Sequence, residues 1–249
     1  MVINMNEKVA LVLGGNGGIG LEIIKSLAGE GINVCAAYHN NKKGLEKLQK
    51  SDKGKVSLYR MDLSDEGSVK NAFNEISRDN SKIDIVVFSA TCPIKNKQIL
   101  DMEWKDFEEH LDIQTKGLFY VVQNLKEQIK SKHKTKFIIL LTEYCIGKPP
   151  VGLSHYISAK YCLMGFAKSM AAELAKYNCT VNMISPGMAD TNLISTLPPK
   201  LIEITAENNP LKRIATPKDV AKVVLFLSSE DSDYLNGVNI TVNGGGVML

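Results

Sequence analysis

The sequence predicts an α/β protein with a doubly wound, seven-stranded parallel sheet that carries helices on both faces. Short apolar runs alternate with longer amphipathic stretches along the whole chain, and several runs are apolar almost throughout, as strands covered on both faces are. Right-handed crossovers place the helices on both sides of such a sheet. No linker, internal repeat or low-complexity tract interrupts the pattern, so we expect residues 1–249 to form a single domain.

Each element is predicted from its own pattern. Seven apolar runs are expected to be strands: Val9–Leu13, Ile32–Tyr38, Val56–Tyr59, Ile83–Phe88, Phe137–Leu141, Val181–Ser185 and Val238–Val242. The stretches between them are expected to be helices: one starting near Gly18, then 42–50, 66–78, 103–131, 154–176 and 217–227. Thr216 before Pro217 is typical of an N-cap followed by proline in the first helical turn.

Composition and charge exclude several classes of protein. The net charge is +3 without a long basic run, which argues against nucleic-acid binding. No run of 18 apolar residues and no signal-like N-terminus occur, so we expect a cytoplasmic protein without a membrane span. The five cysteines form no CxxC pair and suit a reducing compartment. No cluster has metal-ligand spacing, so no metal is expected.

A glycine-rich segment, 14–20, joins the first strand to the first helix. Its sequence GGNGGIG fits both GxGxxG and GxxxGxG. Glycines permit a tight turn and a close approach of the backbone to a pyrophosphate, and the helix N-terminus offers unpaired N–H groups. The strand before and the helix after favour a dinucleotide site over a glycine turn without a ligand. The residues expected to contact the cofactor here are Gly14, Asn16, Gly18, Ile19 and Gly20.

The end of the second strand bears on the choice of cofactor. There the chain reads YHNNKK from Tyr38, without the acidic residue that would bond the 2′-hydroxyl of NAD. A turn flanked by lysines suits a 2′-phosphate, so NADP(H) is favoured over NAD(H), with His39 and Asn40 beside the adenosine. The usual arginine is missing, and Lys42 and Lys43 alternatively begin a solvated helix face.

Tyr156 and Lys160 lie four residues apart near the start of a predicted helix, on one face of it. A phenol has a pKa of about 10, and a nearby lysine is expected to lower it. The pair can then exchange a proton with an alcohol oxygen. YxxxK alone is better interpreted as a solvated helix pair. Beside it, His155 is expected to face outward or toward the substrate cleft.

Together, the glycine motif and the Tyr156–Lys160 pair resemble the short-chain dehydrogenase/reductase family over essentially the whole chain, most closely its 3-oxoacyl-ACP reductases and secondary-metabolism ketoreductases. The resemblance implies a single-domain Rossmann fold. It also implies that Tyr156 protonates the substrate carbonyl while Lys160 holds the nicotinamide ribose. Further cofactor contacts implied by matching positions are Asp62, Leu63, Ser89, Ala90, Pro186, Gly187, Met188 and Thr191.

Two positions depart from the family pattern. Gln114 replaces the relay asparagine, and its amide can still serve a water relay through Lys160. Glu143 replaces the helper serine 13 residues before Tyr156. A carboxylate there repels the developing negative charge, and losing such a donor costs roughly 100- to 1000-fold in rate.

Four interpretations of Glu143 stay open. Burial can keep its carboxyl protonated, so that it acts as a donor. Thr142, one residue earlier, can supply the missing hydroxyl. Glu143 can instead recognise a cationic or hydroxyl-rich substrate. The last alternative is that Glu143 points to solvent and the enzyme is slow.

The sequence therefore predicts NADPH-dependent reduction of a 3-oxoacyl thioester or similar β-keto compound, free or on an acyl carrier. Two alternatives stay open: a weakly catalytic cofactor-binding partner subunit, or an enzyme of the same family acting on a sugar or cyclic alcohol. The irregular segment of about 187–210, rich in proline, is expected to be a mobile substrate lid or an ordinary surface excursion.

Self-association is expected as well. The helix after Ser154 carries apolar residues on more than one face, including Tyr161, Leu163 and Phe166. The resemblance implies that this helix pairs with its counterpart in a tetramer or dimer, the alternative being a core within one chain.

Overall fold

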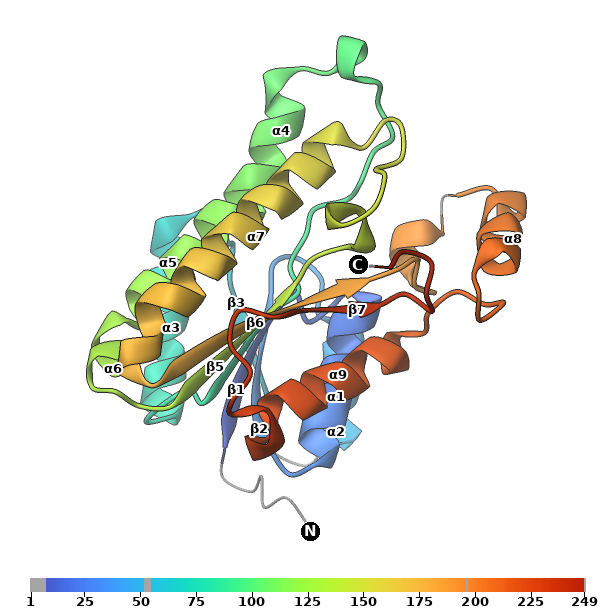
Figure 1. Ribbon diagram of the computed structural model, residues 1–249. Helices are drawn as coiled ribbons and strands as arrows, with labels where there is room; N and C mark the ends of the chain where they lie inside the picture. The colour runs from blue at the N-terminus through green and yellow to red at the C-terminus, as the bar shows by residue number, and fades with distance from the viewer. Residues whose placement is uncertain (1–7, 52–54, 196, 249) are drawn as a thin grey trace.

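The computed structural model describes residues 8–51, 55–195 and 197–248 (Figure 1). Its centre is one seven-stranded parallel sheet with the order β3-β2-β1-β4-β5-β6-β7, so the predicted doubly wound sheet is confirmed. All seven predicted strands are present. They are β1 Val9–Leu13, β2 Asn33–Tyr38, β3 Val56–Arg60, β4 Ile85–Phe88, β5 Thr135–Leu140, β6 Cys179–Pro186 and β7 Asn239–Val242.

Helices cover both faces of the sheet (Figure 1). Those packed on one face are α3 Glu66–Asp79, α5 Gly117–Asn124, α6 Lys126–Lys130 and α7 Ser154–Leu174, with α4 Trp104–Leu111 alongside α7. Those on the other face are α1 Gly18–Gly29, α2 Lys43–Ser51 and α9 Pro217–Ser228. Residues of β1 alternate between the two cores, since Leu11 contacts the first and Val12 the second. A strand buried on both sides must be apolar throughout, which is the pattern that predicted it.

The topology fixes where a ligand can bind. β1 lies between β2 and β4, so the chain leaves β1 toward one side of the sheet and leaves β4 toward the other. The connections at the carboxyl ends of these two strands diverge and open a crevice between them. The glycine-rich segment follows β1 at this point, and Ser89 and Ala90 follow β4.

The long helix expected over 103–131 is interrupted. A π-helical turn, Asp112–Lys116, separates α4 from α5, and a second break at Leu125 separates α5 from α6. Residues in the turn keep helical backbone angles, which explains why the sequence pattern hides the break. The close packing of Gly117 on Leu63 constrains α5, because a Cβ at Gly117 would lie 2.8 Å from the Cβ of Leu63.

The segment 187–210 is more regular than the sequence predicted. It contains a 3₁₀ turn, Asn192–Ile194, and the helix α8 Pro199–Asn208. Pro199 occupies the first helical position, where a missing N–H costs nothing, so the double proline starts a helix. In Figure 1, α8 stands apart from the sheet beside the end of β7.

Other local predictions can be compared with the structure directly. Thr216 caps α9 as predicted, in a capping box with Asp219. Among the described residues, no helix is long and apolar enough to cross a membrane. All five cysteines are free thiols, and only Cys162 is exposed.

Candidate active site

In the turn formed by the glycine-rich segment, Gly14, Gly18 and Gly20 leave no room for a side chain. Gly14 has a φ of +82°, and a Cβ there would lie 2.7 Å from the Cα of Ala90. A Cβ at Gly20 would collide with the carbonyl oxygen of Gly14. At Gly18 a Cβ would lie 2.8 Å from the methyl carbon of Thr191, so this predicted contact residue sits directly on the turn. The bare backbone at the start of α1 suits a pyrophosphate.

Replacing Gly20 by alanine should weaken binding of a nicotinamide dinucleotide about tenfold or more, because the glycine turn must shift to relieve the collision with Gly14. Fluorescence titration with NADPH measures the effect. Gly29→Ala is the matched control at the other end of α1, where nothing lies within 4 Å of an added Cβ, and it should leave the affinity unchanged. Equal affinities for wild type and Gly20→Ala would show that this turn does not seat the cofactor.

A cavity of about 430 Å³ lies beside this turn. Eight of the residues predicted to contact the cofactor line it: Gly14, Asn16, His39, Asn40, Asp62, Leu63, Ser89 and Ala90. Its carboxylate, Asp62, is held by the N–H of Ser64 at 3.0 Å and lies 3.3 Å from Nε2 of His39. The polar residues that line this cavity suit the adenosine half of a dinucleotide.

The remaining predicted contacts lie elsewhere. Ile19 packs on the core under α1 and does not line the cavity. Gly187 and Met188 line a separate cavity of about 290 Å³, next to Glu143, and Pro186 precedes them at the end of β6. Thr191, four residues after Gly187, lies against Gly18 and joins this segment to the glycine turn.

The charges near the end of β2 differ from expectation in one respect. Lys42 is paired with Glu46 at 3.1 Å, as expected of a solvated helix face, and Lys43 begins α2. Arg60 ends β3 directly beside Tyr38 and is exposed. No sequence motif pointed to this basic residue. Its position at the carboxyl end of a predicted strand was the signal that could have found it.

Tyr156 and Lys160 are both buried, 7% and 3% exposed, on the first turns of α7. The ammonium of Lys160 donates to the carbonyl oxygen of Leu140 at 2.7 Å and lies 5.8 Å from the centre of the Tyr156 ring. Burial lowers the pKa of Lys160 to about 8. A lysine with this pKa loses its proton as the pH rises through about 8, while its side chain is anchored to the end of β5.

The pKa of Tyr156 is raised, contrary to the expectation that Lys160 lowers it. Burial disfavours the phenolate and outweighs the other effects, and the opposing contribution comes from a hydrogen bond with Thr142. The phenol is accordingly protonated at neutral pH. A protonated phenol is the form that a proton donor needs.

Thr142, one residue before the position of the family's serine, presents a hydroxyl to Tyr156. Its side chain is buried, its Oγ1 accepts a hydrogen bond from the N–H of Tyr144 at 3.5 Å, and it is hydrogen-bonded to the Tyr156 phenol. The residue ends the extended segment after β5 and caps the 3₁₀ turn Glu143–Cys145. Thr142 and Tyr156 therefore form one hydroxyl pair.

Glu143 is only partly exposed and lines the cavity beside Gly187 and Met188, which argues against the alternative that it points to solvent. Its carboxylate lies between two glycines: a Cβ at Gly187 would be 3.2 Å from Oε1, and one at Gly246 would be 3.4 Å from Oε2. The side chain of Asn243 and the backbone N–H of Met188 donate hydrogen bonds to it. Burial raises its pKa, although these two hydrogen bonds oppose the shift.

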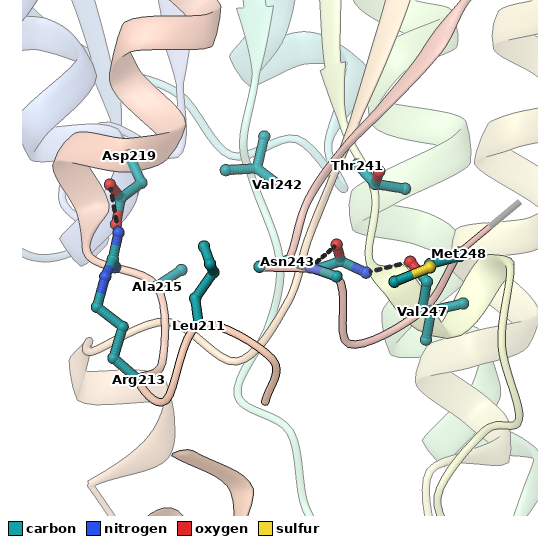
Figure 2. Close-up of a pocket in the computed structure, with 11 residues that line it drawn as sticks. Leu211, Arg213, Ala215, Asp219, Thr241, Val242, Asn243, Val247 and Met248 are labelled. Carbon is teal, nitrogen blue, oxygen red and sulfur yellow. Dashed lines mark hydrogen bonds and ion pairs between the residues drawn. The ribbon is translucent and has the colours of Figure 1, made fainter. Parts of the chain in front are cut away.

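The C-terminal turn, whose Asn243 and Val247 are labelled in Figure 2, borders the cavity that Glu143 lines. Asn243 donates from Nδ2 to the carbonyl oxygen of Val247 at 2.8 Å and accepts from the N–H of Gly245 at 3.2 Å. A third cavity, of about 570 Å³, lies between this turn and the segment that follows α8, where Arg213 is paired with Asp219 at 2.7 Å. The side chain of Glu143, which follows β5, therefore contacts the C-terminal turn at Gly246.

Gln114 lies in the π-helical turn and is fully buried. Its Nε2 lies 3.2 Å from Nδ1 of His110, and its Oε1 has no hydrogen-bond partner. His155 is also buried, with its ring 4.8 Å from that of His110, so the expectation that it faces outward or into the cleft is wrong. Its packing against α4 explains the difference. No group of described residues could hold a metal ion.

Comparisons with known proteins agree with this geometry. A family model described as Enoyl-(Acyl carrier protein) reductase matches residues 14–246. The chain is 35% identical over 249 residues to the 3-oxoacyl-(acyl-carrier-protein) reductase FabG of Aquifex aeolicus, covering 98% of this chain and 99% of the relative. For the protein of that name from Haemophilus influenzae, the identity is 34% over 245 residues, with 97% and 98% covered.

The fold comparison covers the chain as completely. A solved short-chain type dehydrogenase/reductase from Mycobacterium marinum matches with a TM-score of 0.91 at 25% identity, covering 99% of this chain and 98% of that one. The parallel sheet, the glycine turn and the Tyr156–Lys160 pair define an NAD(P)-dependent oxidoreductase. With these matches, the chain belongs to the short-chain dehydrogenase/reductase family.

Proposed function

We propose that this protein uses NADPH to reduce the keto group of a 3-oxoacyl thioester, or of a similar β-keto compound, to an alcohol. The substrate is a small molecule or an acyl group on a carrier, as the names of the relatives suggest. The observation that carries the proposal is the buried, protonated Tyr156, hydrogen-bonded to Thr142 and close to Lys160. A partner subunit without catalysis has no need of this arrangement.

The residues divide the reaction among them. The hydride comes from bound NADPH. Tyr156 donates its proton to the substrate oxygen, and the Thr142 hydroxyl donates a hydrogen bond to the same oxygen as negative charge develops. Lys160 binds the nicotinamide ribose and keeps positive charge beside the phenol. Gln114 supports a water that returns a proton to Lys160.

Glu143 then acts as an anchor for the substrate side of the site. Both of its known partners, Asn243 and the N–H of Met188, are donors, which suits an ionised carboxylate better than a protonated one. Thr142 is left as the hydroxyl that takes the place of the serine. The carboxylate holds the C-terminal turn against the segment that follows β6 and carries Gly187.

A panel of ketones tests the proposal. NADPH oxidation should be followed with acetoacetyl thioesters, with simple β-keto esters and with cyclic and sugar ketones. Turnover with the thioester supports the proposal, whereas background rates with every ketone would contradict it. Faster turnover of hydroxylated ketones would favour the alternative of a sugar or cyclic alcohol, for which the polar lining of the cavity beside Glu143 (Lys148, Thr205, Asn208) argues.

The alkaline pH profile follows from Lys160. The ammonium is the binding form, and it loses its proton as the pH rises through about 8. We expect kcat/KM for NADPH to fall above this pH, because kcat/KM reports the groups of the free enzyme. In Lys160→Met this alkaline limb should vanish along with most of the activity. A flat wild-type profile between pH 7 and about 10 would contradict the role of Lys160.

The preference for NADP is tested at Asn40, which lines the adenosine cavity. Asn40→Asp should weaken NADPH binding about tenfold or more, because its carboxylate repels the 2′-phosphate, and should leave NADH binding unchanged or tighter. Titration with both cofactors measures the switch. Asn40→Ser alters the size without adding charge and should keep the preference. Tighter NADH than NADPH binding in wild type would overturn the assignment.

The lid and the oligomer belong to the same proposal. Helix α8 exposes Leu201 and Ile204 beside the cavity of Glu143, which suits a lid that closes on substrate.

Exposed Phe119 and Tyr161 border an apolar groove of about 600 Å³ between α5 and α7, which suits pairing with a second copy in a tetramer or dimer. Sedimentation of the purified protein would reveal a monomer if this is wrong. We place the protein in the cytoplasm.

A further inference from the structure

A cluster of buried rings lies directly behind Tyr156. His110, from α4, lies 5.8 Å from the Tyr156 ring and 4.8 Å from the ring of His155, each time edge to face. Phe107 closes the cluster on the far side of His155 at 6.4 Å. Both histidines are almost fully buried, 2% and 3% exposed. Buried imidazole nitrogens usually have hydrogen-bond partners, and Nδ1 of His155 has none, so the partner that His110 does have is informative.

Gln114 provides that explanation for His110. An amide nitrogen can only donate, so the contact of 3.2 Å between Nε2 of Gln114 and Nδ1 of His110 makes Nδ1 the acceptor. Burial lowers the pKa of His110 to about 4, and the charges of His155 and Lys160 lower it further while Asp106 opposes them. His110 therefore stays neutral and available as an acceptor throughout the working range.

The oxygen of the same amide, Oε1 of Gln114, has no hydrogen-bond partner. Because Nε2 is committed to His110, Oε1 of Gln114 must face the opposite way, and it is buried without any hydrogen-bond partner. The turn Asp112–Lys116, which carries Gln114, packs against α7, which carries Lys160, so the buried amide and the buried lysine lie in the same region. An acceptor left unpaired in the interior marks the position of a polar guest such as water.

We propose that His110 is a positioning residue that fixes the amide of Gln114, so that Oε1 holds the water which returns a proton to Lys160. The inference rests on the proposed function. After Tyr156 has given its proton to the product oxygen, one proton must return from solvent. It passes through this water to Lys160, which replaces the proton of the phenol. No electrons move in these steps.

The chain needs such a residue because it carries glutamine at this position. Glutamine has one more rotatable bond than asparagine, so its amide samples more orientations unless it is held. His110 lies one helical turn earlier, at i and i+4, where a side chain can reach the amide directly. The π-helical turn between α4 and α5 carries Gln114 into this position.

Three variants separate positioning from packing. His110→Leu keeps a buried side chain but removes the acceptor, whereas His110→Asn restores an acceptor close to the place of Nδ1. Phe107→Leu disturbs the same ring cluster without touching the hydrogen bond between His110 and Gln114. Steady-state reduction of the best ketone is measured for each across pH 6–9, in water and in deuterium oxide.

The expected pattern is specific. In His110→Leu, kcat should fall about tenfold, the value of one lost hydrogen bond, with KM for ketone and NADPH within twofold. Its solvent isotope effect should rise and its pH profile should shift. His110→Asn should recover most of the rate, and Phe107→Leu should retain the wild-type profile. Unchanged kinetics in His110→Leu, or equal losses in all three variants, would overturn the inference.

A spectroscopic measurement keeps this inference separate from the proposed function. Imidazole ¹⁵N resonances of wild type should show an unprotonated Nδ1 at His110, and Gln114→Leu should shift it. An active enzyme whose His110 carries its proton on Nδ1 would overturn the positioning role alone. A protein with the hydrogen bond intact but no reductase activity would overturn the proposed function, and the relay with it.

Discussion

Tyr156→Phe should lower kcat for ketone reduction by roughly 100- to 10,000-fold, the usual contribution of a positioned acid. Only the hydroxyl is removed, and the ring contacts with His110 and Lys160 persist. Binding of NADPH should therefore stay within about twofold, since Tyr156 does not line the adenosine cavity. Single-turnover kinetics at saturating NADPH isolate the chemical step.

The matched control for this substitution is Tyr234→Phe, because Tyr234 is fully exposed near the end of the chain and the same hydroxyl is removed. It should be indistinguishable from wild type. A Tyr156→Phe enzyme with wild-type turnover would mean that the proton reaches the substrate from another group. Loss of NADPH binding in that variant would instead indicate a structural role for the phenol.

The sequence predicted most of the architecture because each strand has a recognisable apolar run. A strand buried on both faces has to be apolar throughout, and a glycine turn after such a strand has few other uses. The break in the long helix was not visible, because the residues in the π-helical turn, Asp112–Lys116, suit an ordinary helix equally well. Only their packing against the neighbouring elements selects the wider turn.

Side-chain directions in the site were the part that sequence could not supply. The position of Glu143 depends on Asn243, 100 residues later in the chain, and on Met188. No local pattern links these residues. The raised pKa of Tyr156 has the same origin, because it reflects how deeply α7 buries the phenol rather than how near Lys160 stands in the sequence. Sequence spacing showed which side chains can share one helix face, whereas tertiary packing determined their contacts and burial.

Thr142→Val should lower kcat by roughly 100- to 1000-fold, the cost of one donor to a developing oxyanion. Valine keeps the branched shape of threonine and removes the hydroxyl that bonds Tyr156. Thr142→Ser retains the hydroxyl and should stay within a few-fold of wild type. The two variants are compared by kcat with the best ketone, and circular dichroism checks that both remain folded.

Glu143→Ser decides between the two explanations for the missing serine. If Thr142 already supplies the donor, a serine at 143 adds nothing, and the loss of the contacts with Asn243 and Met188 frees the C-terminal turn. We then expect KM for the ketone to rise while kcat does not increase. If the carboxylate is only a defect in an otherwise ordinary site, the serine should raise kcat tenfold or more. In that outcome Thr142→Val would have little effect in the Glu143→Ser background, because the new hydroxyl replaces the old one.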